Sequence, residues 1–394
     1  MANLPEKATH RATRTFNQQL VLRAIYDRSE VSRAELARLT GLTRTSISAL
    51  VAELLRDELV EETGRGPSTG GKAPIMLQVR PDGRHAIGLD LGASTFSGAL
   101  VDLRGSVVQS AHVDLEGRNG ADAIELVYGL VDSLMRRNGH SSLLGVGIGA
   151  PGLVDSRAGI VRWAVNLDWT DLPLASLVSD RFGLPVVVAN DTQAAAVAES
   201  TYGAVPWPQS LIVVRVGRGI GAGIILGGQL YQGDDSAAGE IGHSIFTPTT
   251  EGHSARPCRC GRVGCLETIA SMPAMVESAN AVNPAVIDDQ SLIDAFNGGD
   301  DEVHAVVLRA ARKLGEGIAA MIATLNVKHV LIIGPATHLG LEYVTEIRRQ
   351  ARASALPMLS RETDIELGET RDDDVVIGAS AMLMTQELGL TLAR

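Results

Sequence analysis

The chain has 394 residues, and at about 100 to 200 residues per domain this length suggests two or three domains. A hydrophobic content of 45% with 21% charged residues is typical of a globular chain and excludes a disordered one. No run approaches the roughly 18 unbroken apolar residues of a membrane helix, and the polar N-terminal segment lacks the apolar core of a secretory signal. We therefore expect a cytoplasmic protein.

The net charge of −11 is unevenly distributed along the chain. Residues 1–80 contain 12 Lys and Arg against 9 Asp and Glu, whereas residues 81–394 contain 23 against 37, so the two parts carry +3 and −14. A protein that binds nucleic acid neutralises phosphates with Lys and Arg. The asymmetry therefore favours a small DNA-facing module attached to an acidic body.

The first eighty residues predict three short helices. Apolar residues at helical spacing indicate a first helix from about 17 to 28. Ser32 and Glu35 have the spacing of a capping box that begins a second helix, which ends at Gly41. Thr43 is placed to cap a longer third helix. Two helices joined by a glycine-containing turn, the second of them longer, form a helix-turn-helix pattern.

A glycine-rich loop after these helices has the character of a wing. Strands expected at 59–62 and 76–79 enclose residues 64–72, which include two basic side chains. Short polar and basic side chains on the third helix are of the types that contact base edges and phosphates. The alternative is a three-helix interaction module or a dimerisation arm without DNA. The residues expected to contact DNA are Arg33, Thr43, Arg44, Thr45, Ser46, Ser48, Arg65 and Lys72.

The remainder of the chain alternates between apolar strands and helical stretches, which predicts an α/β fold. Two strand pairs, each joined by a tight glycine-containing turn, are separated by 125 positions. Aligning Ile87 with Ile212 places Gly92 on Gly217, so the body is predicted to be internally duplicated, with two lobes and a cleft between them. Such turns can cradle phosphates, although tight β-turns without a ligand use the same residues. The expected strands are 85–91, 96–101, 211–216 and 221–226.

An Asn–Asp pair marks a candidate binding site. Asn190 and Asp191 follow a predicted strand, 185–189, and precede a predicted helix, 192–199. The carboxyl ends of strands are the usual place for ligands in α/β proteins. Asp191 suits a general base on a hydroxyl group or a residue that orients a polyol. The alternative role for Asp191 is the helix N-cap.

Three cysteines, Cys258, Cys260 and Cys265, lie within eight positions. An odd, tightly clustered set in a chain without a signal sequence favours a metal site over disulfides. Three thiolates and one imidazole make a structural zinc site, against the alternative of three unrelated buried thiols. The fourth ligand is either His243 or His253. A metal-bound histidine whose second nitrogen faces the cleft would link zinc to ligand binding.

These motifs together resemble the ROK family of repressors, open reading frames and sugar kinases. The specific matches are Gly-Ile-Gly-Ala-Gly at 219–223, Ala-Gly-Glu-Ile-Gly-His at 238–243, and the Cys-x-Cys-Gly-x-x-Gly-Cys-x-Glu run at 258–267. The resemblance implies a two-lobed, actin-like (ribonuclease-H-like) α/β domain. A leading winged helix-turn-helix is typical of the repressor branch. We expect a DNA-binding domain at 1–80 and a ROK sugar-binding domain at 81–394, with a zinc loop at 243–267.

The resemblance also implies roles for particular residues. Asp191 matches the general base of the kinases and would be catalytic only if kinase activity is retained. His243, rather than His253, matches the family zinc ligand, although its gap to Cys258 is longer than usual. The implied sugar-binding residues are Asn166, Asn190, Asp191, Glu240, His243 and Glu267. The implied ligands of a structural Zn²⁺ are His243, Cys258, Cys260 and Cys265.

The nucleotide side departs from the pattern of the family's kinases at 90–96, 217–219 and 334–337. Arg218 stands where kinases have a small hydroxyl residue, and Pro335 removes a backbone N–H donor from a glycine run. Arg218 can still pair with phosphate. We nevertheless expect ATP binding, and with it kinase activity, to be lost.

The leading hypothesis is a sugar-responsive transcriptional repressor of carbohydrate-metabolism genes. It would bind operator DNA as a homodimer or homotetramer and take a sugar or sugar phosphate in the cleft between the lobes. One alternative is an ATP-dependent hexose kinase that carries a DNA-binding arm. The other is a constitutive DNA-binding protein with a vestigial sugar pocket.

Overall fold

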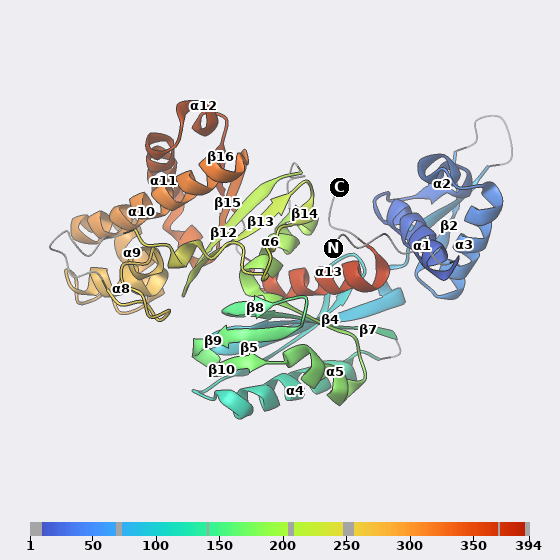
Figure 1. Cartoon of the computed structure of the whole chain (residues 1–394), viewed down its shortest axis with the longest axis horizontal. Coiled ribbons are helices and arrows are strands. Elements are labelled where there is room, and N and C mark those ends of the chain that lie inside the picture. Colours follow the sequence, from blue (N-terminus) through green and yellow to red (C-terminus); the bar gives the residue numbers. More distant parts are fainter. Residues whose placement is uncertain are drawn as a thin grey trace, which may run out of the picture.

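The computed structural model describes residues 10–67, 73–139, 142–203, 209–246, 256–368 and 371–390. Figure 1 shows an N-terminal unit of helices beside two lobes, each built around its own sheet. Within the described ranges, every helix is too short or too polar to span a bilayer.

The N-terminal unit has the predicted helix-turn-helix and the predicted strand pair after it, whereas residues 68–72 of the expected wing loop lie outside the described residues. The Ser32 hydroxyl accepts a hydrogen bond from the Glu35 N–H at 3.2 Å, and Gly41 adopts a φ of 70° at the end of the second helix. The Thr43 hydroxyl caps the third helix by accepting from the Ser46 N–H at 3.1 Å. The elements are α1 (His10–Tyr26), β1 (Val31–Ser32), α2 (Arg33–Thr40), α3 (Arg44–Arg56), β2 (Val60–Arg65) and β3 (Ile75–Val79).

Three details of this unit differ from the prediction. Helix α1 begins at His10 rather than near residue 17, because its first turns are polar and lack the apolar periodicity used to find helices. The two-residue strand β1 pairs with β3 and is too short to leave a sequence signal. The Glu35 carboxylate, expected to complete a capping box, instead lies 3.3 Å from the Arg28 guanidinium.

The first lobe contains a five-stranded sheet in the order β11-β7-β4-β5-β6, flanked by α4 and α5, and a small three-stranded sheet in the order β10-β9-β8. The sheet is mixed: β4 pairs antiparallel with β5 and parallel with β7. Its elements are η1 (Pro81–Gly83), β4 (Arg84–Leu91), β5 (Thr95–Asp102), β6 (Val107–Asp114), α4 (Gly120–Arg137), β7 (Ser142–Ala150), β8 (Leu153–Asp155), β9 (Ile160–Ala164), η2 (Val165–Leu167), β10 (Trp169–Leu172), α5 (Leu174–Phe182) and β11 (Val186–Asn190).

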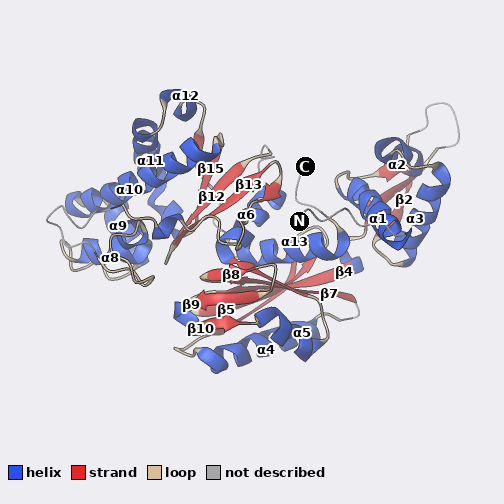
Figure 2. Ribbon diagram, viewed as in Figure 1, coloured by secondary structure: helices blue, strands red, loops and turns tan. Residues whose placement is uncertain are grey.

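The second lobe repeats this topology, with the sheet order β14-β13-β12-β15-β16. Figure 2 shows the strands of both lobes in red and the helices around them in blue. Strand β12 pairs antiparallel with β13 and parallel with β15, as β4 does with β5 and β7, which confirms the predicted duplication. The elements of this part are α6 (Asp191–Tyr202), β12 (Leu211–Val216), β13 (Ile220–Leu226), β14 (Gln229–Leu230), η3 (Ile241–His243), α7 (Glu267–Ala270), α8 (Met272–Asn280), α9 (Asp289–Asn297), α10 (Asp301–Leu325), β15 (His329–Ile333), η4 (Pro335–Leu339), α11 (Gly340–Ser354), α12 (Pro357–Ser360), β16 (Asp364–Leu367) and α13 (Asp374–Leu388).

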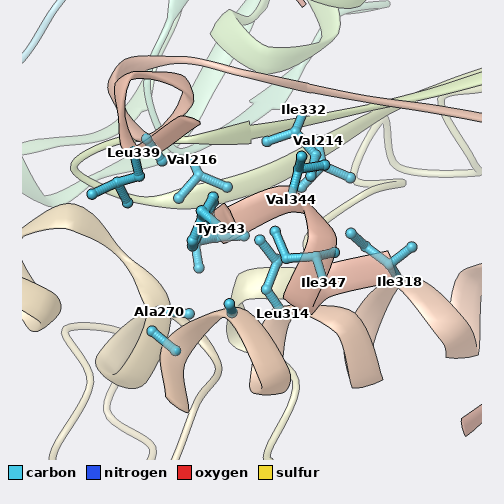
Figure 3. Packing of buried hydrophobic residues seen from close by; sticks show 14 of the residues in the cluster. Val214, Val216, Ala270, Leu314, Ile318, Ile332, Leu339, Tyr343, Val344 and Ile347 are labelled. Atoms are coloured by element: carbon cyan, nitrogen blue, oxygen red, sulfur yellow. The ribbon is translucent and has the colours of Figure 1, made fainter. Parts of the chain in front are cut away.

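The core of the second lobe lies between its sheet and helices α10 and α11. Figure 3 shows Val214 and Ile332 of the sheet facing Val344 and Ile347 of α11, with Leu314 of α10 below them. All five side chains are fully buried. This apolar layer fixes the orientation of β12, whose carboxyl end reaches the cleft.

Helices α6 and α13 pack against each other between the two sheets (Figure 1). A Cβ atom at Gly378 of α13 would lie 1.8 Å from the Ala194 carbonyl oxygen of α6. On the other side of α13, a Cβ at Gly88 of β4 would lie 2.2 Å from the Val376 carbonyl oxygen. Glycine is therefore required at both contacts, and the two helices form a tightly packed central layer.

Candidate functional site

Four sulfur and nitrogen ligands meet at one point of the second lobe. The ligand atoms of His243, Cys258, Cys260 and Cys265 all lie within 4.8 Å of one another. The Cys258 sulfur is 3.5 Å from His243 Nδ1, and the Cys260 and Cys265 sulfurs are 3.6 Å apart. Tetrahedral zinc with bonds of about 2.0–2.3 Å requires ligands roughly 3.3–3.8 Å apart. The described residues therefore form a candidate metal centre of suitable size, and His253 lies outside them.

Two glycines hold the His243 segment against the sheet. Gly239 and Gly242 lie on either side of Glu240. A Cβ at Gly239 would lie 1.7 Å from the Ala222 carbonyl oxygen of β13, and a Cβ at Gly242 would lie 2.2 Å from the Ile220 carbonyl oxygen. With the Nδ1 atom of His243 facing the cysteines, its Nε2 atom points toward the Glu240 carboxylate, 3.8 Å away. This is the arrangement expected for a histidine that links a metal centre to a polar cleft.

Three acidic side chains lie close together beside this histidine. Burial, together with the neighbouring carboxylates of Asp191 and Glu267, raises the pKa of Glu240 to about 7. The Glu267 carboxylate also accepts from the Ile220 N–H at 3.3 Å, which ties it to the turn before β13. Carboxyl groups concentrated in this way can accept several hydrogen bonds from the hydroxyls of one polyol.

Arg215 is a site residue that the sequence prediction missed. Its guanidinium donates to Asp191 Oδ2 at 2.7 Å, while Asp191 Oδ1 accepts from the Thr192 N–H at 2.7 Å. Both carboxylate oxygens of Asp191 are thus engaged within the protein. The signal that could have found Arg215 is a single charge in the buried strand Leu211–Val216, because a cation there requires an acidic partner.

The two asparagines of the predicted sugar site have protein partners. Asn190, rather than Asp191, is the N-cap of α6: its Oδ1 accepts from the N–H groups of Thr192 and Gln193, and its Nδ2 donates to the Gly152 carbonyl at 3.0 Å. Asn166 lies in η2 of the first lobe, where it accepts from Arg259 of the cysteine loop at 2.6 Å. The structure thus groups Asp191, Glu240, His243 and Glu267.

A cavity of about 780 Å³ opens between the lobes next to Arg215. Its lining includes Asp90 and Thr95 from the first lobe, Pro335 from the second, and Asp374 at the start of α13. Two of the three segments predicted for the nucleotide side, 90–96 and 334–337, therefore contribute to one cavity. The glycines of the 219–223 motif serve packing: a Cβ at Gly223 would lie 2.2 Å from the Ala196 Cβ.

The charge of this cavity predicts a pH-dependent stability. Burial raises the pKa of Asp90 to about 6, although Arg215 opposes the shift. Because the pKa of Asp90 is higher in the folded than in the unfolded chain, its protonated form stabilises the fold. This contribution is fully present below the unfolded-state pKa of about 4 and is lost as pH rises through about 6. We expect Asp90→Asn to raise the melting temperature by on the order of a few °C at pH 8 but not at pH 4.5.

Differential scanning fluorimetry across this pH range measures the effect. Asp364→Asn, at an exposed position of β16, is the matched control and is expected to leave the profile unchanged. A stabilisation by Asp90→Asn that is equal at pH 4.5 and pH 8 would contradict the assignment of the pH dependence to this carboxyl.

The predicted DNA contacts cluster on α3 and the wing. Thr43, Arg44, Thr45 and Ser48 are exposed, and Arg65 is exposed at the end of β2. Ser46 is half-buried and Arg33 donates to Glu62 at 2.8 Å. The Ser48 hydroxyl donates to the Arg44 carbonyl at 2.9 Å. Lys72 lies outside the described residues.

With this geometry established, comparisons with known proteins identify the family. A model described as the ROK family matches residues 86–386. The chain belongs to the ROK family. A second model, described as the MarR family, matches residues 13–68 of this ROK protein. The fold is thus a winged helix followed by the two-lobed ROK fold, as the sequence motifs predict.

The relatives of this ROK protein include both regulators and kinases. The xylose repressor of Caldicellulosiruptor bescii is 30% identical over 395 residues, covering 96% of this chain and 98% of the relative. A solved ROK transcriptional regulator, described as a homolog of the E. coli MLC protein, superimposes with a TM-score of 0.84 at 26% identity, covering 96% and 98%. A ROK glucokinase from Streptomyces griseus, solved with glucose and AMPPNP, superimposes with a TM-score of 0.67 at 27% identity. The match covers 76% of this chain and 98% of the glucokinase chain.

Proposed function

We propose that this protein is a sugar-responsive transcriptional repressor. Residues 1–80 would form the DNA-binding domain and residues 81–394 the sugar-binding domain. The winged helix would present exposed side chains of α3, together with Arg65, to an operator, and the group around Asp191, Glu240, His243 and Glu267 would bind a sugar or sugar phosphate. A full-length relative is named a xylose repressor, which supports this assignment. Binding as a homodimer or homotetramer accords with the paired half-sites of operators.

The observation that carries the proposal is the ion pair between Arg215 and Asp191. In a sugar kinase the aspartate must accept a proton from the sugar hydroxyl. Here the guanidinium donates to one oxygen at 2.7 Å and the Thr192 N–H donates to the other at 2.7 Å, so both oxygens are already hydrogen-bonded within the protein. The side chain can still orient a sugar hydroxyl, which suits a site that binds sugar without phosphorylating it.

The test is a titration of the protein's own upstream DNA against a panel of sugars and sugar phosphates, with and without ATP. We expect sugar to change the operator affinity and ATP to have no effect. The rival function, an ATP-dependent sugar kinase carrying a DNA-binding arm, has the position of Asp191 in its favour. ATP turnover with a hexose that is abolished by Asp191→Asn would establish the rival. Operator affinity that no sugar changes would indicate a vestigial pocket.

We also propose that the His243–Cys258–Cys260–Cys265 cluster holds one structural Zn²⁺. Three thiolates and one imidazole are the donor set zinc prefers, and their spacing fits a tetrahedral ion. When bound, zinc would stabilise the loop by joining His243 to the cysteines. His243 would then hold its Nε2 edge toward Glu240 and the cleft.

A substitution on α3 tests the DNA-binding face. Arg44 is exposed at the first position of α3, where side chains reach a major groove. We expect Arg44→Ala to weaken operator binding by roughly 5- to 150-fold, equivalent to about 1–3 kcal/mol, with sugar binding unchanged. Fluorescence anisotropy at fixed salt measures the affinity. Arg361→Ala, exposed on the second lobe, is the matched control, and equal effects of the two would refute the assignment.

A further inference from the structure

Tyr26, the last residue of α1, contacts both lobes from the DNA-binding unit. Its backbone carbonyl accepts from Arg104 Nη1 at 2.7 Å, and the same guanidinium lies 4.7 Å from the centre of the Tyr26 ring. Its hydroxyl donates to the hydroxyl of Tyr202 at 3.3 Å. We call Tyr26, Arg104 and Tyr202 the junction.

The two partners of Tyr26 belong to different parts of the body. Arg104 lies in the turn between β5 and β6 of the first lobe, a turn that the Asp102 carboxylate orders by accepting from the Arg104 and Ser106 N–H groups at 2.8 Å. Tyr202 is the last residue of α6, which packs on β12 and β13 of the second lobe. A Cβ at Gly105 would lie 2.6 Å from the Tyr202 ring, so turn and ring are in close contact.

Helix α6 connects the junction to the candidate sugar site. Asp191, engaged by Arg215, is its first residue and Tyr202 its last. At a rise of 1.5 Å per residue these two residues are about 17 Å apart along the helix axis. Residues 192–199 are all buried between β13 and α13, with close glycine contacts on both sides. A helix packed this tightly moves as a rigid body, because its contacts leave no room for bending.

The other elements next to α1 also reach the cleft. Strands β5 and β6 contribute Thr95, Ser97 and His112 to the cavity lining. Helix α13 begins at Asp374 in the same cavity and ends beside α1, where a Cβ at Gly389 would lie 2.7 Å from Gln19. Figure 1 shows α13 extending from between the lobes toward the N-terminal unit.

We propose that the junction transmits the angle between the lobes to the DNA-binding unit. Closure of the lobes on a sugar would move α6 relative to the β5–β6 turn. Tyr26 is hydrogen-bonded to Tyr202 of α6 and to Arg104 of that turn. The displacement changes the orientation of α1, and with it the spacing of the recognition helices in a dimer. This inference rests on the proposed function and names the residues that couple its two sites. A ligand acts on DNA affinity only through such a difference between two states.

Three substitutions test the junction. Tyr26→Phe and Tyr202→Phe each remove the bond between the two hydroxyls and retain the rings. Arg104→Met removes the bond to the Tyr26 carbonyl and the charge over its ring but keeps an apolar stem. The readout is the ratio of operator dissociation constants with and without one sugar, the member of the panel that changes wild-type operator affinity most, measured by fluorescence anisotropy. Sugar affinity of the DNA-free protein is measured by calorimetry, and Tyr231→Phe, at an exposed tyrosine, is the control.

We expect each junction variant to bring this ratio about two- to tenfold closer to one, which is the effect of losing one hydrogen bond. Sugar affinity without DNA should stay within about twofold of wild type. The double variant Tyr26→Phe/Tyr202→Phe should match either single variant, because both remove the same bond. Folded variants that keep the wild-type ratio overturn the junction alone. A wild-type protein whose operator binding no sugar changes overturns the proposed function as well.

Discussion

Glu240→Ala is expected to weaken sugar binding by about 10- to 150-fold and to leave operator binding without sugar unchanged. The carboxyl lies beside Asp191, Glu267 and His243, where it can accept hydrogen bonds from the hydroxyl groups of a sugar. Hydrogen bonds to charged groups contribute about 1.5–3 kcal/mol each, which gives the expected range. The variant should therefore respond to sugar only at much higher concentration. Calorimetry measures sugar affinity, and anisotropy with operator DNA measures the response.

Glu366→Ala is the matched control for this prediction, because Glu366 is exposed on the edge strand β16. It should leave both sugar affinity and operator response at wild-type values. Operator binding by Glu240→Ala could instead respond fully at the sugar concentration that suffices for the wild-type protein. In that case the group around Asp191 would not be the sugar site. Loss of operator binding without sugar would instead indicate a folding defect, which a melting curve would reveal.

Cys260→Ser is expected to reduce bound zinc from about one ion per chain to near zero and to weaken sugar binding by about 10- to 100-fold. Loss of a ligand removes most of the metal affinity. His243 would then lose its fixed position beside Glu240, and misplaced supporting groups typically cost one to two orders of magnitude. Elemental analysis of freshly purified protein measures zinc, and calorimetry measures sugar affinity.

Arg262→Ala, in the same loop, is the control for the zinc prediction. We expect it to retain both zinc and sugar binding, because Arg262 is not among the four clustered ligands. Wild-type protein without zinc would refute the metal assignment. Zinc loss without any change in sugar affinity would show that the loop and the sugar site are independent.

Short-range signals made the helix-turn-helix and the clustering of the cysteines predictable. The caps at Ser32 and Thr43 depend on a side chain reaching a backbone group three residues away. Cys258, Cys260 and Cys265 are close in sequence, so their convergence needs only a glycine-rich turn. The duplicated strand pairs were also visible, because each pair is local and repeats at a fixed interval.

Contacts between distant segments were decided by the tertiary structure. The Arg215–Asp191 pair joins positions 24 residues apart, and it places a cation on the carboxylate that kinases would use as a base. The assignment of the N-cap to Asn190 depends on backbone angles that residue types alone leave open, since Asn and Asp both cap helices.

Spacing along the chain was enough to predict a winged helix, a duplicated α/β body and a Cys–His cluster. How these parts contact one another depends on the packing of the whole chain. Tyr26 and Tyr202 are 176 residues apart, and no pattern of composition or periodicity relates them. Their contact exists because α6 packs between two sheets and so carries one end to the cleft and the other to the DNA-binding unit. Local patterns specify helices and strands, whereas packing over the whole chain brings distant residues such as Tyr26 and Tyr202 into contact.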